Sequence, residues 1–198
     1  MNINVSINFN SWDRIISRIK IIIVVVLFTI TNSCVHVKIT KDTFDYRYYE
    51  LKKVFAWMNP EIYDIIKTEA NQQRSKIDIH VDYVKLISSV IMAESGEFCN
   101  NNYEYMKVVI SYASARGLMQ VIPRFHAPKD PDSLYNPKIN VHKGVMYFTH
   151  CLQKSIKEGH KNPIRIACLY YNAGAGAKIW RYRNWGYVNK IERYYGKA

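Results

Sequence analysis

Glu94 is the one carboxylic acid whose surroundings in the sequence suggest a catalytic acid. It follows Ile87, Val90 and Ile91 by seven, four and three residues, so these side chains share one face of a helix. Burial among apolar side chains disfavours the charged form of a carboxyl group and raises its pKa. A carboxylic acid that stays protonated near neutral pH can donate its proton to a glycosidic oxygen. A glutamate at a fraying helix end has the same spacing, so Glu94 alone leaves both interpretations open.

Four short motifs follow one another along the chain, and Glu94 lies in the first. They are Glu94-Ser95 with Phe98 close behind, the run Ser-Tyr-Ala-Ser-Ala-Arg-Gly-Leu-Met-Gln at 111–120, Asn-Val-His-Lys-Gly at 140–144 with Tyr147, and Tyr-Asn-Ala-Gly at 171–174. A further Tyr-Val-Asn-Lys-Ile run stands at 187–191. The most specific element is Gly-Leu-Met-Gln, which is soon followed by a proline.

In this order the motifs resemble those of the soluble lytic transglycosylase family, which is similar in fold to goose-type lysozyme. The resemblance covers roughly residues 82–195. It implies a mainly α, lysozyme-like helical domain with a substrate groove. The implied reaction cleaves the β-1,4 bond between N-acetylmuramic acid and N-acetylglucosamine in the glycan strands of peptidoglycan. It leaves a 1,6-anhydro-muramic acid end.

The resemblance also implies a role for each matching residue. Glu94 would be the catalytic acid and then the base, Ser111 would orient the sugar, and Tyr171 would place its hydroxyl near the Glu94 carboxyl. Six further residues would contact the substrate: Ser95, Met119, Gln120, Tyr147, Asn172 and Tyr187.

One carboxyl group suffices for the implied reaction. Glu94 would protonate the oxygen that leaves C1 of the muramic acid and then accept a proton from the C6 hydroxyl of the same sugar. That hydroxyl would attack C1 and outcompete water because it is held within the same molecule. The acid and base roles come in sequence, so one group can serve both. The resemblance implies neither a metal nor an organic cofactor.

Two other functions stay open on the sequence. A lysozyme-type muramidase would hydrolyse the same bond with a positioned water. The segment between Glu94 and Ser111 is longer than the family usually shows, and its Glu97 and Glu104 are candidates for a second carboxylate. A catalytically silent peptidoglycan-binding or scaffold module is the other alternative. The joint presence of Glu94, Ser111 and Tyr171 argues against it.

The first 37 residues have the pattern of an export or anchoring segment. Basic residues at 14, 18 and 20 precede an apolar run over 21–30. That run is shorter than the ~20 residues that a membrane-spanning helix needs. Cys34 follows Thr-Asn-Ser, which resembles a relaxed lipoprotein processing box. A lipoprotein signal, an uncleaved membrane anchor and a cleaved signal peptide all stay open. Each places the rest of the chain in the cell envelope, outside the cytoplasm, and leaves a protein partner in an envelope machine open.

The remaining residues predict helices throughout. Apolar residues recur at helical spacing from residue 44 onwards, Pro60 and Pro163 suit first helical turns, and Asp82 suits an N-cap. Period-two strand patterns are absent. We therefore expect a helical extension over 38–76 and a catalytic domain over 77–198.

The charge and the cysteines restrict the possible partners. The net charge is +12, which favours acidic partners, but no basic run interleaved with aromatic residues marks a nucleic-acid surface. The sequence has no Cys or His spacing of a zinc site, so we expect no bound metal. Cys151 and Cys168 lie on consecutive predicted helices, where they would form either a disulfide or two buried thiols.

Overall fold

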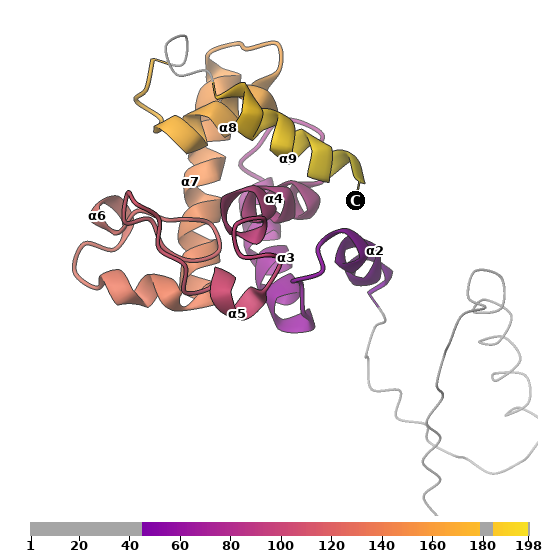
Figure 1. Ribbon diagram of the computed structural model, residues 1–198. Helices are drawn as coiled ribbons and strands as arrows, with labels where there is room; N and C mark the ends of the chain where they lie inside the picture. Colours follow the sequence, from indigo (N-terminus) through magenta and orange to yellow (C-terminus); the bar gives the residue numbers. More distant parts are fainter. Residues whose placement is uncertain (1–44, 179–183, 198) are drawn as a thin grey trace, which may run out of the picture. The chain divides into compact units, whose positions relative to one another are not determined.

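The computed structural model describes residues 45–178 and 184–197 (Figure 1). The predicted mainly α fold class is confirmed. Within the described ranges, β contacts are limited to two isolated bridges, which join Ile110 to Arg116 and Arg116 to Val121. The predicted export segment over 1–37 and Cys34 lie outside the described residues.

The described residues form eight α-helices and two helical turns of other types. The α-helices are α2 (Tyr46–Val54), α3 (Pro60–Arg74), α4 (Tyr83–Ile91), α5 (Tyr103–Met106), α6 (Pro123–His126), α7 (Pro137–Lys157), α8 (Pro163–Ala173) and α9 (Trp185–Lys197). A π-helical turn, η1 (Met92–Gly96), follows α4, and a 3-10 turn, η2 (Pro131–Tyr135), precedes α7. The stretch between α6 and α7 therefore contains a helical turn.

Local sequence signals account for several helix ends. The Asn59 side chain accepts a hydrogen bond from the backbone N–H of Ile62, and Pro60 occupies the first position of α3. Asp82 caps α4 through the N–H of Lys85, as its position predicts. Helix α8 begins at Pro163 and ends before Gly174, whose φ of +94° lies in the left-handed region.

The long helix α7 lies at the centre of the core. It packs against α3 and α8, while α4 packs against α3 and α9 (Figure 1). The apolar stripe of α7 is buried: Val141, Val145, Phe148 and Leu152 have no exposed surface, and Ile156 is partly buried. This arrangement brings α4 into contact with α9, although α9 comes much later in the sequence.

Helix α3 belongs to the same core, although we assigned it to an extension. Its Ile62 and Ile66 are fully buried, and Glu69 accepts a 2.8 Å hydrogen bond from His142 of α7. The division into an extension over 38–76 and a catalytic domain from residue 77 stays a prediction. Among the described helices, none has the length and hydropathy needed to span a membrane.

Candidate active site

A groove of about 830 Å³ contains most of the residues for which we predicted a role. Its walls come from η1, the segment 111–122, α6, α7 and the end of α8 with the loop that follows. Six of the nine predicted site residues line it: Glu94, Ser111, Gln120, Tyr147, Tyr171 and Asn172. Glu94 is the one acidic side chain in this lining.

Glu94 lies in the π-helical turn that continues α4, instead of in a regular α-helix as we expected. The turn is closed by the backbone N–H of Glu97, which donates to the carbonyl of Met92 over 3.2 Å. Single π-helical turns are rare and occur often at functional sites. Here the wider turn carries Glu94 at the point where α4 reaches the groove.

The surroundings of Glu94 favour a carboxyl group that titrates near neutral pH. Burial is the largest influence and raises its pKa to about 7. Two groups on α9 oppose that shift: a hydrogen bond from the Tyr187 hydroxyl and the positive charge of Lys190. The side chain keeps some exposure to the groove, so a substrate can reach it.

The hydroxyl that donates a hydrogen bond to Glu94 is that of Tyr187, whereas we expected the hydroxyl of Tyr171 near this carboxyl. Tyr187 is almost fully buried behind the groove, and its hydroxyl donates to Glu94 Oε1 over 2.6 Å. The Tyr171 hydroxyl donates instead to the backbone carbonyl of Met119, over 2.8 Å. Burial, followed by the nearby charge of Glu94, raises the pKa of both phenols well above its ordinary value, so both keep their protons.

Two further predicted substrate contacts, Ser95 and Met119, are absent from the groove lining, as Tyr187 is. Both residues are fully buried. The Ser95 hydroxyl donates to the carbonyl of Leu118 over 2.8 Å, which ties the turn of Glu94 to the Gly-Leu-Met-Gln segment. The Met119 side chain packs against the α carbon of Gly144 on α7, where a β carbon would approach its sulfur to 2.5 Å.

Asn140 organises the Gly-Leu-Met-Gln segment. This buried amide donates to the carbonyls of Arg116 and Leu134 over 2.7 and 2.9 Å, and it accepts from the N–H of Met119 over 2.9 Å. Gly117 lies beside it with a φ of +71°, and an added β carbon would come within 2.8 Å of the Leu134 carbonyl. A glycine is therefore required there by both backbone conformation and space.

The other predicted residues of the groove are held by short polar contacts. Ser111 accepts from the N–H of Ala115 over 3.1 Å, which shapes a tight loop at the rim. The Gln120 amide donates to the Gly117 carbonyl over 2.9 Å. The Tyr147 hydroxyl accepts from the N–H of Ala175 over 2.8 Å, and Asn172 accepts from the side chain of Asn184 over 3.2 Å.

Sequence reasoning missed the residues of α6 that line the groove, Arg124, Phe125 and His126. Burial lowers the pKa of His126, so its ring is neutral at physiological pH. The exposed pair Arg124 and Phe125 adds a cation and an aromatic face at the rim. Their position directly after Pro123 was the available signal, because a proline there begins a helix at the end of the motif.

The two other candidate carboxylates lie outside the groove lining. Three side chains of α9 bind Glu97, and its pKa is lowered. Glu104 is exposed and forms an ion pair with Lys107.

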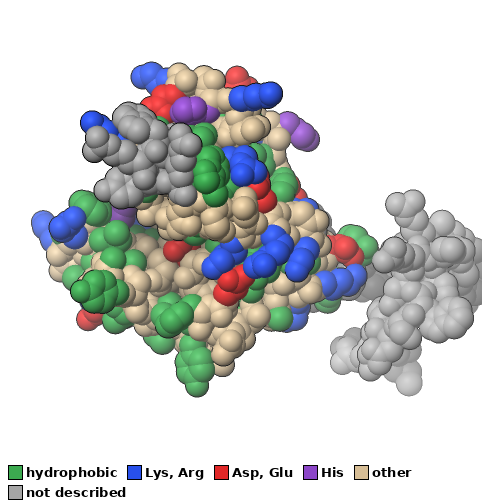
Figure 2. All heavy atoms as spheres, turned by 45° about the horizontal axis from the view of Figure 1, so that its top comes forward, with side chains coloured by type: hydrophobic (Ala, Val, Ile, Leu, Met, Phe, Trp, Pro, Cys, Tyr) green, Lys and Arg blue, Asp and Glu red, His purple; other side chains and the backbone are tan. Residues whose placement is uncertain are grey.

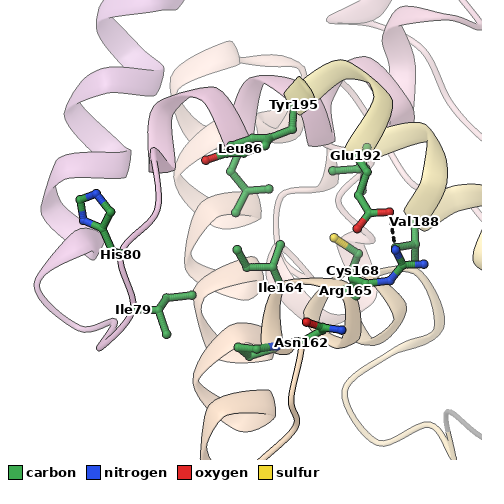
Figure 3. Close-up of a pocket in the computed structure, with 12 residues that line it drawn as sticks. Ile79, His80, Leu86, Asn162, Ile164, Arg165, Cys168, Val188, Glu192 and Tyr195 are labelled. Carbon is green, nitrogen blue, oxygen red and sulfur yellow. Dashed lines mark hydrogen bonds and ion pairs between the residues drawn. The ribbon is translucent and has the colours of Figure 1, made fainter. Parts of the chain in front are cut away.

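A second pocket, of about 550 Å³, lies between α4, α8 and α9 and shares no lining residue with the groove. Its floor is apolar, with Leu86 and Ile164 pointing into it (Figure 3). Its one carboxylate, Glu192, binds Arg165 over 2.6 Å (Figure 3). This pocket therefore lacks a free acid, and the groove around Glu94 is the better candidate for chemistry.

Charged side chains on the surface carry both signs. On the face visible in Figure 2, Lys and Arg side chains are scattered, with Asp and Glu side chains among them. Within the described ranges, no three His, Cys, Asp or Glu side chains are grouped so that they could hold a metal ion. Cys99, Cys151 and Cys168 are buried free thiols, so the disulfide between Cys151 and Cys168 is not formed here.

Residues 61–192 match the family described as Transglycosylase SLT domain. A membrane-bound lytic murein transglycosylase C of Actinobacillus pleuropneumoniae serotype 5b (strain L20) is 37% identical over 98 residues, covering 41% of this chain and 27% of that protein. The protein of the same name in Histophilus somni (strain 2336) is 29% identical over 164 residues, covering 69% of this chain and 43% of that protein. The chain thus spans less than half the length of these curated relatives. No solved structure gives a significant match.

Proposed function

Since this chain belongs to the transglycosylase SLT domain family, we propose that it is a peptidoglycan lytic transglycosylase with Glu94 as its acid and base. The observation that carries the proposal is the single carboxyl group in the groove, with a pKa of about 7. A group with this pKa can donate a proton and take one back near neutral pH. The relatives named membrane-bound lytic murein transglycosylase C support the same activity.

In the first step, protonated Glu94 gives its proton to the glycosidic oxygen between N-acetylmuramic acid and N-acetylglucosamine. The bond from C1 of the muramic acid to that oxygen breaks, and the oxygen leaves as the 4-hydroxyl of the glucosamine. Positive charge develops at C1, where the acetamido group of the muramic acid assists. The Glu94 carboxylate, held by Tyr187, remains beside that sugar.

In the second step, the Glu94 carboxylate takes the proton from the C6 hydroxyl of the muramic acid. The C6 oxygen forms a bond to C1, which closes the 1,6-anhydro ring and regenerates protonated Glu94. No water is consumed. Ser111, Gln120, Tyr147 and Asn172, which line the groove, are proposed to bind the sugars, and Tyr171 to hold the segment of Met119 in place.

We further propose that the chain works in the cell envelope and is attached to the membrane through its first 37 residues, by an anchor or a lipid on Cys34. The pattern of basic and apolar residues there supports this, as do the relatives described as membrane-bound. Fractionation of cells expressing the Cys34→Ala variant tests the lipid. Release of the protein from the membrane fraction supports lipidation, whereas unchanged retention supports an anchor.

The activity is tested by mass spectrometry of muropeptides released from purified peptidoglycan. The full chain in detergent is compared with Glu94→Gln and with the matched control Glu104→Gln, which alters an exposed glutamate outside the groove. We expect 1,6-anhydro-muramic acid ends from the unaltered chain and from Glu104→Gln, and none from Glu94→Gln. Reducing ends would identify a hydrolase instead, and products from Glu94→Gln would rule out Glu94 as the acid.

A further inference from the structure

Glu97, three residues after Glu94, binds three side chains of the same helix. Its Oε2 forms an ion pair with the Lys190 ammonium over 2.8 Å, and its Oε1 accepts from the Arg193 guanidinium over 2.6 Å. The Tyr194 hydroxyl also donates to Oε1. All three partners lie on α9, which also carries Tyr187.

The spacing of these contacts places the two glutamates against one face of α9. Tyr187, Lys190 and Tyr194 are separated by three and four residues, so they lie on one side of that helix. Glu94 contacts Tyr187 and Glu97 contacts the next turns of α9. Glu97 also closes the π-helical turn of Glu94 through its backbone N–H. The turn and α9 are therefore attached at two points, of which one is the candidate acid.

We propose that Glu97 is a positioning residue for this reaction, because it holds α9 against the turn of Glu94 and so keeps the Tyr187 hydroxyl on the catalytic carboxyl. The inference rests on the proposed function of Glu94. Glu97 itself does not line the groove, so its effect on catalysis is exerted through α9.

An ordinary surface ion pair would not account for this arrangement. The Glu97 side chain is 31% exposed, and ion pairs at such sites contribute little to stability. The contacts are instead concentrated on the helix that supplies the hydrogen bond to Glu94. A misplacement of about 1 Å in such a contact can reduce a rate by up to about 100-fold.

Two explanations of Glu97, positioning and a simple effect of its charge, predict opposite changes in the pKa of Glu94. Glu94 is faced by Tyr187 and Lys190 of α9 and by Tyr171 of α8, while Glu97 is faced by Lys190, Arg193 and Tyr194. If Glu97 acted only as a negative charge, its removal would stabilise ionised Glu94 and lower its pKa. If Glu97 positions Tyr187, its removal weakens a hydrogen bond to ionised Glu94 and raises that pKa.

The test measures kcat and KM against pH for the full chain and for Glu97→Gln, Tyr187→Phe and the double variant, with Glu104→Gln as control. For Glu97→Gln we expect kcat to fall about 3- to 10-fold, with KM nearly unchanged. The alkaline side of the profile, where kcat falls as pH rises, should move to higher pH, as in Tyr187→Phe. Adding Glu97→Gln to Tyr187→Phe should change kcat by less than about twofold, because both act through one contact.

Several results would overturn the inference. One is an alkaline limb of the kcat profile that moves to lower pH in Glu97→Gln, and another is a pH profile of Glu97→Gln that does not change. A third is a double variant in which the two single effects on kcat multiply fully. If Glu97→Gln fails to fold, the variant pair Arg193→Gln and Tyr194→Phe removes two of the three donors from the α9 side and should give the same upward shift. Failure of the proposed function is distinguishable, since the unaltered chain would then release no anhydro products.

Discussion

The Tyr187 hydroxyl and the Glu94 carboxyl lie 2.6 Å apart and join α9 to the turn at the end of α4, across 93 residues of sequence. A hydrogen bond from a neutral phenol favours the ionised carboxylate, whereas the burial of Glu94 favours the neutral acid. Burial is the stronger influence, and the pKa of Glu94 is raised to about 7. The contact thus limits how far burial can raise that pKa.

The activity of the chain should fall as pH rises through the pKa of Glu94. The reaction begins with the protonated acid, so kcat/KM should decline above pH of about 7. Tyr187→Phe removes the donor that favours the ionised form, and the decline should move to higher pH by up to about one unit. Initial rates of muropeptide release from pH 5 to 9, approximately, measure both profiles. An identical limb in the two proteins would contradict the role of the contact.

The stability of the fold should depend on the ionisation of Glu94 in a predictable direction. Its pKa is about 7 in the folded chain against an ordinary value of 4.5, so the folded state binds more protons between these values. Stability from this group is therefore fully present below pH 4.5 and is lost as pH rises towards 7. Glu94→Gln lacks this loss. The free energy of unfolding of the variant minus that of the unaltered chain should therefore be about 1–3 kcal/mol larger at alkaline pH than at acid pH. Urea unfolding at both pH values measures the difference, and a gain independent of pH would contradict it.

Gly117→Ala should disturb the groove more than Gly159→Ala. Both glycines have a positive φ, of +71° and +72°, but a β carbon on Gly159 would meet nothing within 4 Å. Gly159→Ala should therefore cost only the backbone strain, about 1–2 kcal/mol of unfolding free energy. Gly117→Ala adds a clash with the Leu134 carbonyl and Asn140, and should cost about 2–4 kcal/mol and most of the activity. If the two variants lost the same thermal stability and the same muropeptide release, the space at Gly117 would be unimportant.

Asn140→Ala should destabilise the fold through the Gly-Leu-Met-Gln segment. It leaves the carbonyls of Arg116 and Leu134 and the N–H of Met119 without their partner. Unpaired buried groups of this kind cost about 2–4 kcal/mol in total. The exposed Asn189→Ala serves as control, with an expected change within about 0.5 kcal/mol. Denaturant unfolding compares the two, and a cost for Asn140→Ala as small as the control's would contradict the central role of this amide.

The buried cysteines should be present as thiols and react slowly. Burial raises the pKa of Cys151 to about 12, and it raises the pKa of Cys168 as well, so neither forms the reactive thiolate near neutral pH. We expect a thiol reagent to leave both unmodified in the native protein and to modify both after unfolding without a reductant. Mass spectrometry of the labelled peptides distinguishes this from a disulfide, which would leave both unlabelled in denaturant.

Much of the helical framework could be predicted because its signals are local. The apolar stripe of α7 and the residues Asp82, Pro60 and Pro163 act within one or two turns of the chain, and the structure agrees with each. The motifs likewise located Glu94, Ser111 and Asn172, which line one groove.

The contacts of these side chains could not be predicted in the same way. Periodicity gives the face of a helix on which Tyr171 or Tyr187 lies, but it does not give the residue opposite. We expected the Tyr171 hydroxyl near Glu94; it donates to the backbone of Met119, and the hydrogen bond to the carboxyl comes from Tyr187. The partners of Glu97 on α9 stand between 93 and 97 positions further along the sequence, so no short-range pattern predicts these contacts. Such pairs depend on how whole helices pack, because shape and burial over the complete core set the distance between two side chains from separate helices.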